Sequence, residues 1–462
     1  MRRQTLFWGD VIILYLSLFL ALFIRYGADP RYVLLLRAHL VPFSIIFAVW
    51  LLVFYIANLY EIRSAKNNYE FYSTLTYSFL TNALFSILFF YFIHFFNITP
   101  KTNLFIFLVV SGILLGSWRY YFNRLSARNT FNNNALFLGL SPQSQQIYDH
   151  LLANPQLGYN ALGIIDTAHY SAPEILEKII AEKDVKTLIL GPEAYLVPRI
   201  INILYKFVGK GMVFYNLSYF YEMATGKVPL GAIDQAWFLA NLSENSKRAY
   251  EVGKRVFDII FAVIIGLVFV VFLPFIILAI KLDSPGPIFY KQKRIGRSGK
   301  IFTLIKLRTM DHDVEKKTGP VWASANDSRR TRVGRFLRRT RIDEAPQIWN
   351  IIRGDMSFVG PRPERPEFHS KLQEDVPFYE ERCLIKPGLT GWAQINYKLD
   401  FKDGMTVRDT FEKVQHDLYY IKNRTLLLDA GIILKTINII LQKLFSKTKK
   451  FITDQPTSPL SS

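Results

Sequence analysis

The apolar stretch FDIIFAVIIGLVFVVFLPFIILAIKL, residues Phe257–Leu282, decides how this chain is organised. It is long enough to cross a hydrocarbon core, which takes about 20 apolar residues. Lys254 and Arg255 precede it, and Lys291 and Arg294 follow it, so positive charge flanks both ends. Because Lys and Arg stay mainly on the cytoplasmic side of a membrane, these flanks favour a helix that enters the membrane, bends and returns to the same face.

Pro274 lies within this run and predicts the position of the bend. Proline removes one backbone donor and clashes with the previous turn, which kinks a helix. We therefore predict a re-entrant membrane helix over residues 250–283. The alternative is a plain fifth span, which would place the rest of the chain outside the cell, against the charge that follows the run.

Further apolar runs fill the N-terminal quarter of the chain and predict a four-helix transmembrane bundle over residues 1–128. The runs are residues 7–24, 40–60, 74–96 and 104–122. Half of the 462 residues are hydrophobic and aromatics reach 15%, which is typical of a membrane protein. The first run is followed by no small-residue cleavage site, so it predicts an anchor rather than a removed signal peptide.

Residues 129–245 predict a Rossmann-like domain with a parallel sheet. Short apolar strands (134–140, 161–166, 187–191, 212–217) alternate with helical stretches (142–153, 173–183, 196–208). This order is typical of α/β nucleotide-binding folds. The dinucleotide fingerprint is not intact, because Gly139 stands alone where three glycines are needed and Pro142 opens the helix. We therefore expect a structural or regulatory domain.

Positive charge is concentrated in one part of the chain. The net charge is +19, and residues 291–341 hold 16 Lys and Arg against 4 Asp and Glu. Such a segment binds phosphates, whether of nucleic acid, lipid headgroups or a nucleotide substrate. Cys383 is the single cysteine of the chain, which excludes an intramolecular disulfide and a multi-cysteine metal site.

Asp343 and Glu344 stand side by side in this basic neighbourhood. Thr340 and Asp343 have the spacing of a capping box, and Pro346 suits a first helical turn, so the sequence predicts a helix from these acids to about Ile352. The amides of its first turn would favour anions. One carboxylate could attack phosphorus while its neighbour helps to place a divalent cation.

Two interpretations of the acids remain open at this point. In one, Arg362, held in the rigid segment Gly360–Pro363, binds phosphate oxygens beside the acids as a planar fork. In the other, the acids only pair with the arginines that precede them, Arg338, Arg339 or Arg341, and cap a helix.

Three longer segments carry a resemblance that favours the first interpretation. They are KLDSPGPIFYKQKRIGRSGKIFTLIKLRTM (281–310), RRTRIDEAPQIWNIIRGDMSFVGPRPERPEF (338–368) and IKPGLTGWAQINY (385–397). In this order and spacing the chain resembles the bacterial sugar transferases, the monotopic polyprenyl-phosphate phosphoglycosyl transferases, over about residues 254–436. Its N-terminal parts resemble those of the large members. The resemblance implies a small α/β catalytic domain over residues 284–446, and the polar residues 447–462 predict a disordered tail.

The resemblance also implies roles for single residues. Asp343 would be the nucleophile that attacks the sugar-bearing phosphorus of a UDP-sugar and releases UMP, and polyprenyl phosphate would then take the phosphosugar from Asp343. Glu344 would assist with proton handling, and both acids would hold Mg²⁺. The phosphate-binding residues would be Arg362, Lys306 and Arg308. A site-forming loop would contain Pro387, Gly388, Thr390, Gly391, Trp392 and Gln394.

The partners implied are a UDP-sugar, undecaprenyl phosphate and membrane lipids, in the first membrane step of exopolysaccharide, capsule or O-antigen synthesis. The location implied is the bacterial inner membrane, with the catalytic domain facing the cytoplasm. The sugar stays open between glucose, galactose and N-acetylated hexosamines. Four spans and an unassigned middle domain would suit a homodimer. Members often carry Ser-Pro at the helix break, whereas this chain has Leu273-Pro274, which removes a local partner for the freed carbonyl.

Other classes of protein remain as alternatives. Asp311-His312-Asp313 is a DxD pattern, and a DxD-type glycosyltransferase would release UDP rather than UMP. A transporter should carry charges in its spans, yet only Asp10 and Arg119 lie within or near them, where both could snorkel. A nucleic-acid binder would explain the basic segment but not a membrane-bound chain. Residues 426–445 predict an interfacial helix, with core packing as the alternative.

Overall fold

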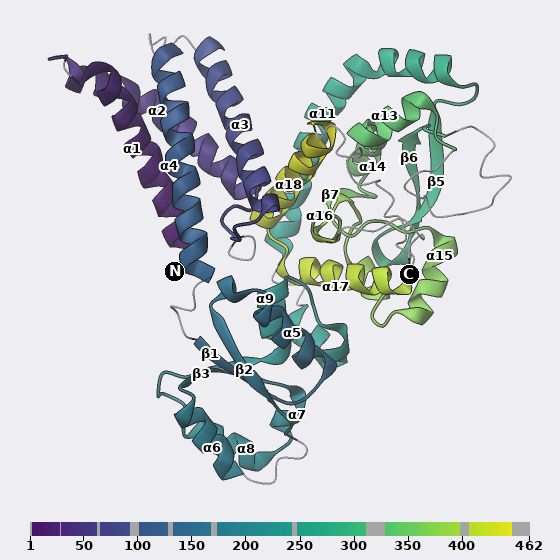
Figure 1. Ribbon diagram of the computed structural model, residues 1–462. Coiled ribbons are helices and arrows are strands. Elements are labelled where there is room, and N and C mark those ends of the chain that lie inside the picture. Colours follow the sequence, from purple (N-terminus) through teal and green to yellow (C-terminus); the bar gives the residue numbers. More distant parts are fainter. Residues whose placement is uncertain are drawn as a thin grey trace, which may run out of the picture. The chain divides into compact units, whose positions relative to one another are not determined.

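The computed structural model describes residues 2–27, 29–61, 65–92, 101–127, 133–167, 173–242, 247–310, 329–397 and 406–445. The chain divides into two compact units, Met1–Ile233 and Asp234–Ser462 (Figure 1). The Asp311-His312-Asp313 pattern and the predicted tail over residues 447–462 lie outside the described residues.

The N-terminal region of the first unit is helical, as predicted. Its helices are α1 (Arg2–Tyr26), α2 (Tyr32–Ile56), α3 (Tyr69–Phe92) and α4 (Lys101–Ala127). Each contains a segment long and apolar enough to cross a membrane. They share one aromatic-rich core in which Phe43, Trp50 and Phe107 are fully buried. Such burial of apolar side chains between helices holds the region together.

Asp10 on α1 and Arg119 on α4 form a fully buried ion pair. Arg119 also donates to the backbone carbonyl of Leu59. The prediction that the two side chains snorkel toward water is therefore wrong. The reason is that α1 and α4 pack side by side, so each charge meets its partner in the interior of the helices, where an unpaired charge would be costly.

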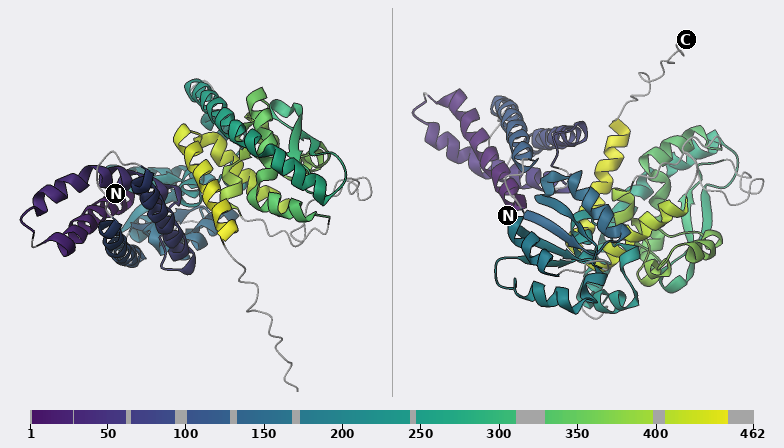
Figure 2. Two further views of the ribbon diagram at one scale, coloured as in Figure 1. Left: turned by 90° about the horizontal axis from the view of Figure 1, so that it is seen from above. Right: turned by 60° about the horizontal axis from the view of Figure 1, so that its bottom comes forward.

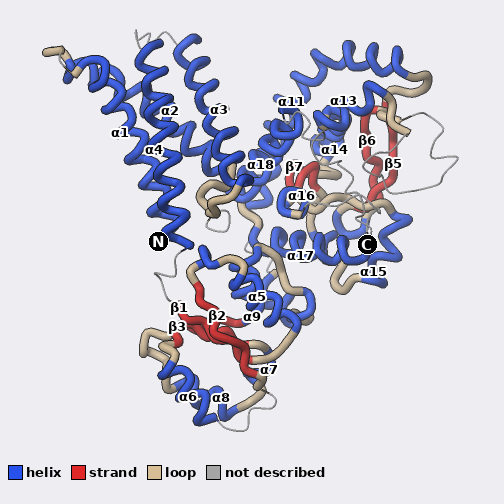
Figure 3. The backbone as a smooth tube through the Cα atoms, viewed as in Figure 1, coloured by secondary structure: helices blue, strands red, loops and turns tan. Residues whose placement is uncertain are grey.

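The rest of the first unit is the predicted parallel sheet, drawn in red in Figure 3. Its strands are β1 (Asn133–Leu138), β2 (Tyr159–Ile165), β3 (Val185–Leu190) and β4 (Val213–Asn216). They pair in the order β2-β1-β3-β4, and every pair is parallel. The predicted strands lie within two residues of these bounds at either end.

Helices cover both faces of this sheet. On one face α5 (Pro142–Leu152) and α9 (Leu217–Thr225) pack against Ala135 and Phe137, and on the other α6 (Pro173–Glu182) and α8 (Pro198–Tyr205) pack against Leu136 and Leu138. Alternate residues of a strand point to opposite faces, so β1 supplies both cores. Shorter elements complete the unit: η3 (Pro155–Leu157), α7 (Pro192–Tyr195) and η4 (Leu230–Ala232).

The strand order of the sheet reverses between β1 and β3, the place where such folds bind a nucleotide. Here Ser141 caps α5 through the amide of Ser144, and Pro142 follows at the first helical position. The Glu193 carboxylate lies over the ends of both strands, because a Cβ built on Gly139 or Gly191 would approach its Oε2 to 2.8 or 2.7 Å. A carboxylate at this point opposes the binding of a phosphate.

The second unit begins with α10 (Gln235–Asn241) and α11 (Arg248–Asp283). An antiparallel hairpin of β5 (Phe289–Ile295) and β6 (Ile301–Leu307) follows, with η6 (Arg297–Gly299) at its turn. The strands β7 (Ser357–Val359) and β8 (Gly388–Thr390) pair in parallel. The helical elements are α13 (Arg332–Thr340), η7 (Ile342–Gln347), α14 (Ile348–Arg353), α15 (Pro366–Asp375), η8 (Glu380–Leu384), α16 (Trp392–Asn396), α17 (Val407–Asn423) and α18 (Leu426–Phe445).

Helix α11 is continuous over 36 residues, with Pro274 inside it. Its ribbon is bent in Figure 1, and Figure 2 shows it lying along other helices of the second unit. Most of its apolar side chains between Ile259 and Leu278 are exposed. The helix thus offers a long apolar surface that the described residues of the unit leave largely uncovered.

The N-terminal end of α11 is fixed to the second unit by buried polar contacts. Lys254 Nζ lies 2.6 Å from Asp429 of α18 and 3.1 Å from the Tyr420 hydroxyl of α17. One turn later the Asp258 carboxylate accepts hydrogen bonds from the Ser357 hydroxyl and the Phe358 amide at β7, both 3.1 Å. These contacts join α11 to three other elements.

The C-terminal end of α11 is fixed to the same unit. Arg308, which follows β6, donates to the carbonyls of Ser284 at 2.6 Å and Pro285 at 2.9 Å. Asp283 accepts a hydrogen bond from the amide of Val333 in α13 at 2.8 Å. Both ends of the apolar helix are therefore attached to one compact unit.

Candidate active site

The acid pair lies on a 3₁₀ turn, not at the start of the predicted helix. Thr340 is the last residue of α13, and its hydroxyl donates to the carbonyls of Phe336 and Leu337 instead of capping a new helix. Arg341 then adopts a left-handed conformation with φ 57° and ψ 17°. Asp343 and Glu344 follow in η7, and α14 begins only at Ile348. The capping-box prediction at Thr340 is therefore wrong.

Glu344 is surrounded by cations from three different segments. Its Oε1 accepts from Lys306 Nζ of β6 at 3.0 Å and from Arg362 Nη2 at 2.9 Å. Its Oε2 lies 3.6 Å from Arg341 Nη1. The anion at this turn is therefore stabilised by side chains that the fold gathers around it, and not by the end of a long helix.

Asp343 is as buried as Glu344 but does not form the same ion pairs. Both residues are 7% exposed. Among the described residues no ion pair involves the Asp343 carboxylate, although Lys306, Arg338 and Arg362 are close enough to act on it through their charge. The pair is thus divided into one acid held by cations and one acid whose oxygens stay available.

This difference in contacts shifts the pKa values of the two carboxyl groups in opposite directions. Burial by itself would raise the pKa of Glu344, but the charges of Lys306, Arg362 and Arg341 outweigh burial and hold that pKa well below its usual range. Burial, and then the negative charge of Glu344, raise the pKa of Asp343 to about 6. At neutral pH both acids are ionised, and Asp343 is the more basic of the two.

Asn350 fixes the turn of the acids to the strand that supplies Lys306. It is fully buried, donates to the carbonyl of Thr303 at 2.8 Å and accepts from the amide of Ile305 at 3.3 Å. The sequence interpretation did not include this residue. Its only signal is an amide side chain within the apolar segment Ile348–Ile352.

Arg362 reaches Glu344 from a loop that is packed backbone against backbone. The Gly360 amide donates to the Thr390 carbonyl and the Gly388 amide to the Pro361 carbonyl, both at 2.9 Å. A Cβ built on Gly388 would lie 2.1 Å from the Gly360 nitrogen, and one built on Gly391 would lie 2.2 Å from the Gly360 oxygen. Only glycines allow this approach, so the two glycines position the arginine loop.

The other residues of the predicted site-forming loop support this packing. Pro387 accepts from the Ser357 amide at 2.9 Å. The Thr390 hydroxyl lies 2.7 Å from that of Thr436 in α18, and Trp392 stacks on Tyr419 of α17. The Oε1 atom of Gln394 is buried and accepts no hydrogen bond within the described part of the chain. These contacts fix the loop to β7, α17 and α18.

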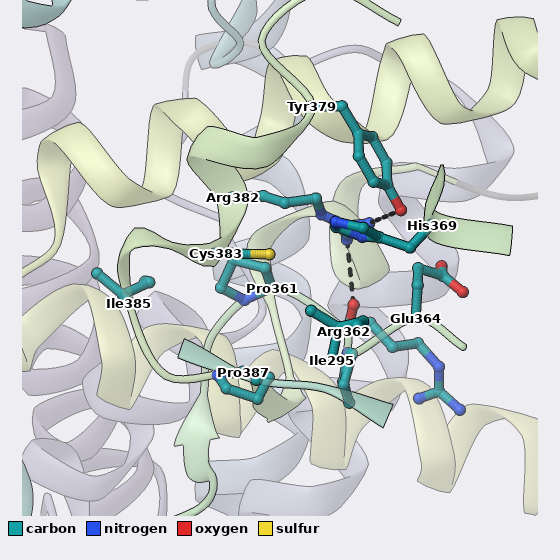
Figure 4. A pocket seen from close by; sticks show the side chains of 12 residues that line it. Ile295, Pro361, Arg362, Glu364, His369, Tyr379, Arg382, Cys383, Ile385 and Pro387 are labelled. Atoms are coloured by element: carbon teal, nitrogen blue, oxygen red, sulfur yellow. Dashed lines mark hydrogen bonds between the residues drawn. The ribbon is translucent and has the colours of Figure 1, made fainter. Parts of the chain in front are cut away.

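Arg382 of η8 holds the Arg362 backbone and was not found from the sequence. Its guanidinium donates to the Arg362 carbonyl at 3.1 Å, to Asp417 of α17 at 2.8 Å and to the Tyr379 hydroxyl at 3.1 Å. Figure 4 shows the guanidinium between Tyr379 and Arg362 in a small pocket that also contains Glu364 and Cys383. Arg382 is therefore a positioning residue for Arg362.

The structure brings together Lys306, Asp343, Glu344 and Arg362, but it places the Arg308 guanidinium elsewhere. Arg308 donates to carbonyls at the C-terminal end of α11 and is buried there. These contacts give it a structural role and leave its predicted role in phosphate binding without support. Lys306 lies in β6 and Arg308 directly follows that strand, yet Lys306 contacts Glu344 and Arg308 contacts the carbonyls after α11.

The predicted Mg²⁺ can be tested against the oxygens present. Glu344 Oε2 is buried and accepts no hydrogen bond within the described residues, and Asp343 offers further oxygen donors. Mg²⁺ takes six oxygens, often few of them from protein. Among the described residues no cluster of three or more acidic, His or Cys side chains could hold a metal, so the two acids fit Mg²⁺ only together with water and the phosphates of a substrate.

Comparison with known families gives two matches. A model of the bacterial sugar transferases matches residues 249–443, and a model of a CoA-binding domain matches residues 55–194. The first match contains the acid turn, the arginine loop and all of α11 except its first residue. The Glu193 carboxylate at the end of β1 and β3 does not fit the phosphate groups of CoA at the usual nucleotide position of the sheet.

Individual relatives agree with the first family. A UDP-N-acetylgalactosamine-undecaprenyl-phosphate N-acetylgalactosaminephosphotransferase of Aeromonas hydrophila is 38% identical over 229 residues, covering 49% of this chain and 52% of that protein. A putative undecaprenyl-phosphate N-acetylgalactosaminyl 1-phosphate transferase of Bacillus subtilis is 51% identical over 144 residues, covering 30% and 78%. A UDP-glucose:undecaprenyl-phosphate glucose-1-phosphate transferase of Caulobacter vibrioides is 40% identical over 194 residues, covering 42% and 71%.

These matches define the class of the chain. It belongs to the bacterial sugar transferase family. The chain spans only about half the length of the Aeromonas relative, and the relatives are named for different sugars.

Proposed function

We propose that the protein transfers a sugar 1-phosphate from a UDP-sugar to undecaprenyl phosphate and releases UMP. The observation that carries this proposal is the division of the acid pair. Glu344 is held by Lys306, Arg341 and Arg362, whereas Asp343 is ionised at neutral pH with its oxygens available. A buried carboxylate beside fixed cations is what attack on a diphosphate requires.

In the first step an Asp343 oxygen forms a bond to the phosphorus that carries the sugar. The bond from this phosphorus to the bridging oxygen breaks, and UMP leaves with that oxygen. In the second step an oxygen of polyprenyl phosphate attacks the same phosphorus, and the bond to Asp343 breaks. Asp343 ends as the carboxylate with which it began, so the nucleophile itself needs no proton.

The cations around the acids bind the charge that moves. Arg362 presents a planar fork suited to phosphate oxygens, and Lys306 adds a buried charge 3.0 Å from Glu344. Mg²⁺ bound by Asp343 and Glu344 would supply further neutralisation of the diphosphate. Lys306 and Arg362 donate hydrogen bonds to Glu344. Glu344 thereby keeps these two cations from forming an unreactive ion pair with Asp343.

The two attachments of α11 support a re-entrant membrane helix. About 20 residues lie between Asp258 and Ile280, which at 1.5 Å each would cross a bilayer if the helix were straight and perpendicular. Both ends are nevertheless bound to one unit. A unit on one side of the membrane can hold both ends only if the helix dips into the bilayer and comes back. We place this unit on the cytoplasmic face of the bacterial inner membrane, where UDP-sugars are found.

The pathway step that follows from this activity is the first membrane step of exopolysaccharide, capsule or O-antigen synthesis. The sugar is one of the UDP-hexoses or UDP-N-acetylhexosamines, since relatives with both kinds of name match the catalytic region. We also propose that the protein forms a homodimer through its first unit and not through the acid site.

The test is a trapping experiment with donor alone. Full-length protein in nanodiscs is mixed with each of a panel of UDP-sugars, and the released nucleotide and the protein mass are measured. The correct donor should release one UMP per protein and leave a phosphohexose on the peptide that contains Asp343. Asp375→Asn, on the exposed surface of α15, is the matched control and should behave as the wild type. Release of UDP, or turnover without a labelled Asp343, would contradict the proposal.

A further inference from the structure

An apolar groove of about 510 Å³ lies between α11 and the elements that carry the acid pair. Gly266 and Phe269 of α11 form one wall, and Ile348 and Trp349 of α14 form the opposite wall. Pro346 of the acid turn also lines it. This groove is separate from the small pocket beside Arg382 and is many times larger.

The groove connects the acid site with the exposed surface of α11. Its lining includes Ala345 and Pro346, which follow Glu344 directly, and Ile305, the neighbour of Lys306. The same lining includes Leu267 and Val270, which are 67% and 61% exposed on the surface of α11 that we propose faces lipid. A molecule in the groove would therefore reach from the bilayer to the nucleophile.

The lining has the chemistry of a site for a charged lipid. Among the described residues that form it, Lys291 of β5 is the only charged one, and the rest are apolar except for Gly266. Lys291 pairs in register with Ile305, so the two side chains lie on the same face of the hairpin, the one that lines the groove. An apolar groove with a cation in its lining fits an anion that carries a hydrocarbon chain, and does not fit a nucleotide or a free sugar.

We infer that this groove binds the first isoprene units of the polyprenyl phosphate acceptor, with Lys291 beside the acceptor phosphate. The inference rests on the proposed function, because it names where the second substrate of that reaction enters. The acceptor oxygen must reach the phosphorus on Asp343 while most of the chain stays in lipid. A groove lined both by Pro346 of the acid turn and by the exposed Leu267 of α11 satisfies both conditions.

Gly266 offers a way to block the groove without unfolding the helix. A Cβ built there has its nearest neighbour, Ile348 Cγ2, at 3.6 Å, which is ordinary van der Waals contact. Leucine is also a better helix former than glycine in a helix interior. Gly266→Leu should therefore fill the groove and leave α11 intact. Val268 is two residues away, 55% exposed and not part of the lining, so Val268→Leu is the matched control.

The experiment separates the two half-reactions of full-length protein in nanodiscs. The burst of UMP from the donor alone reports the first step, and the KM for the acceptor reports the second. Two acceptors are used, undecaprenyl phosphate and the short farnesyl phosphate. Gly266→Leu should keep the donor burst and raise the KM of both acceptors at least tenfold, and Lys291→Gln should raise it several-fold. Val268→Leu should change neither the burst nor the KM.

A second variant keeps the test decisive if Gly266→Leu does not fold. Trp349 is 58% exposed at the wall of the groove, and Trp349→Ala should also raise the acceptor KM with an unchanged donor burst. If both variants leave the KM of both acceptors unchanged, an ordinary phospholipid chain occupies the groove and the inference is wrong. If the wild type shows no donor burst while it turns over, the proposed function itself fails, which is a different result.

Discussion

Two buried charge clusters in this protein have opposite designs. In the first unit Asp10 and Arg119 face each other as one acid and one base, both fully buried between α1 and α4. In the second unit Lys306, Arg341 and Arg362 all form ion pairs with Glu344, and its neighbour Asp343 forms none among the described residues. The first cluster is neutral and closed, while the second leaves an ionised oxygen and a surplus of positive charge. The difference teaches that burial of charge indicates chemistry only where the pairing is incomplete.

Replacing Asp343, the acid that forms no ion pair among the described residues, should have the largest effect on activity. Asp343→Asn keeps the shape of the side chain but eliminates the nucleophile, so turnover should fall by at least about 10⁴-fold, the scale of losing a catalytic nucleophile. Initial rates of UMP release measure this. Asp375→Asn serves as the control, and more than a few per cent of residual turnover would remove Asp343 from the mechanism.

The second largest effect on kcat should come from changing the shape of the Arg362 cation. Arg362→Lys keeps the charge but loses the planar fork that meets both Glu344 and phosphate oxygens. We expect kcat to fall roughly 10–100-fold, consistent with the loss of one charge-assisted contact of about 1.5–3 kcal/mol. Arg365→Lys, in the same segment but paired with Glu367, should retain wild-type kinetics. Equal rates for Arg362→Lys and wild type would show that charge alone suffices.

The pH dependence should report the raised pKa of Asp343. Because the ionised carboxylate attacks, the rate of the donor half-reaction should rise about tenfold per pH unit at low pH and level off above a pKa of about 6. Glu344 stays ionised throughout this range, since its pKa lies well below its usual range. A stopped-flow burst measured from pH 4.5 to 8 gives the profile. A rate independent of pH across this interval would contradict the ionisation order of the pair.

The smallest expected effects concern stability, and neutralising one acid in each cluster should change the stability in opposite directions. The pKa of Asp343 is raised from 3.8 to about 6 in the folded protein, so its ionisation opposes folding, and the stability it contributes below about pH 4 is lost as the pH rises through 6. At pH 7 Asp343→Asn should therefore stabilise the protein by roughly 1–3 kcal/mol.

Asp10→Asn should do the reverse, because it leaves Arg119 buried without its counter-charge, at a cost of about 3 kcal/mol, while the donor half-reaction stays intact. Replacing both partners, as Asp10→Leu with Arg119→Met, should recover most of this loss. Thermal unfolding in nanodiscs compares the variants. Destabilisation by Asp343→Asn would mean that the second cluster is a structural ion pair like the first.

The local features of the fold were predictable from the sequence because they depend on neighbouring residues. The apolar runs predicted the four N-terminal helices with ends up to eight residues off, and the alternation of strands and helices predicted the strands of the parallel sheet within two residues. The acid turn, in contrast, was predicted as a helix capped by Thr340, since the spacing alone carries no information about Arg341. Its left-handed conformation ends α13 and lets its side chain approach Glu344.

The candidate site was predictable in its residue types but not in its pairing. Motif resemblance selected Lys306, Asp343, Glu344 and Arg362, and the structure brings these four together. The same reasoning placed Arg308 with them, although its guanidinium binds the carbonyls after α11. Arg382 and Asn350 escaped notice because they hold backbone atoms, and no local pattern shows which backbone atom a side chain will meet.

The sequence by itself determined which chemistry is available: an apolar helix with basic flanks, two adjacent acids, and arginines near a rigid loop. Hydropathy and residue type are properties of consecutive positions, so one chain is enough to read them. Only the tertiary structure decided which acid is held and which stays available. Glu344 meets Lys306 and Arg362 across 38 and 18 residues of chain, and contacts over such distances exist only after folding brings β6, η7 and the arginine loop to one place.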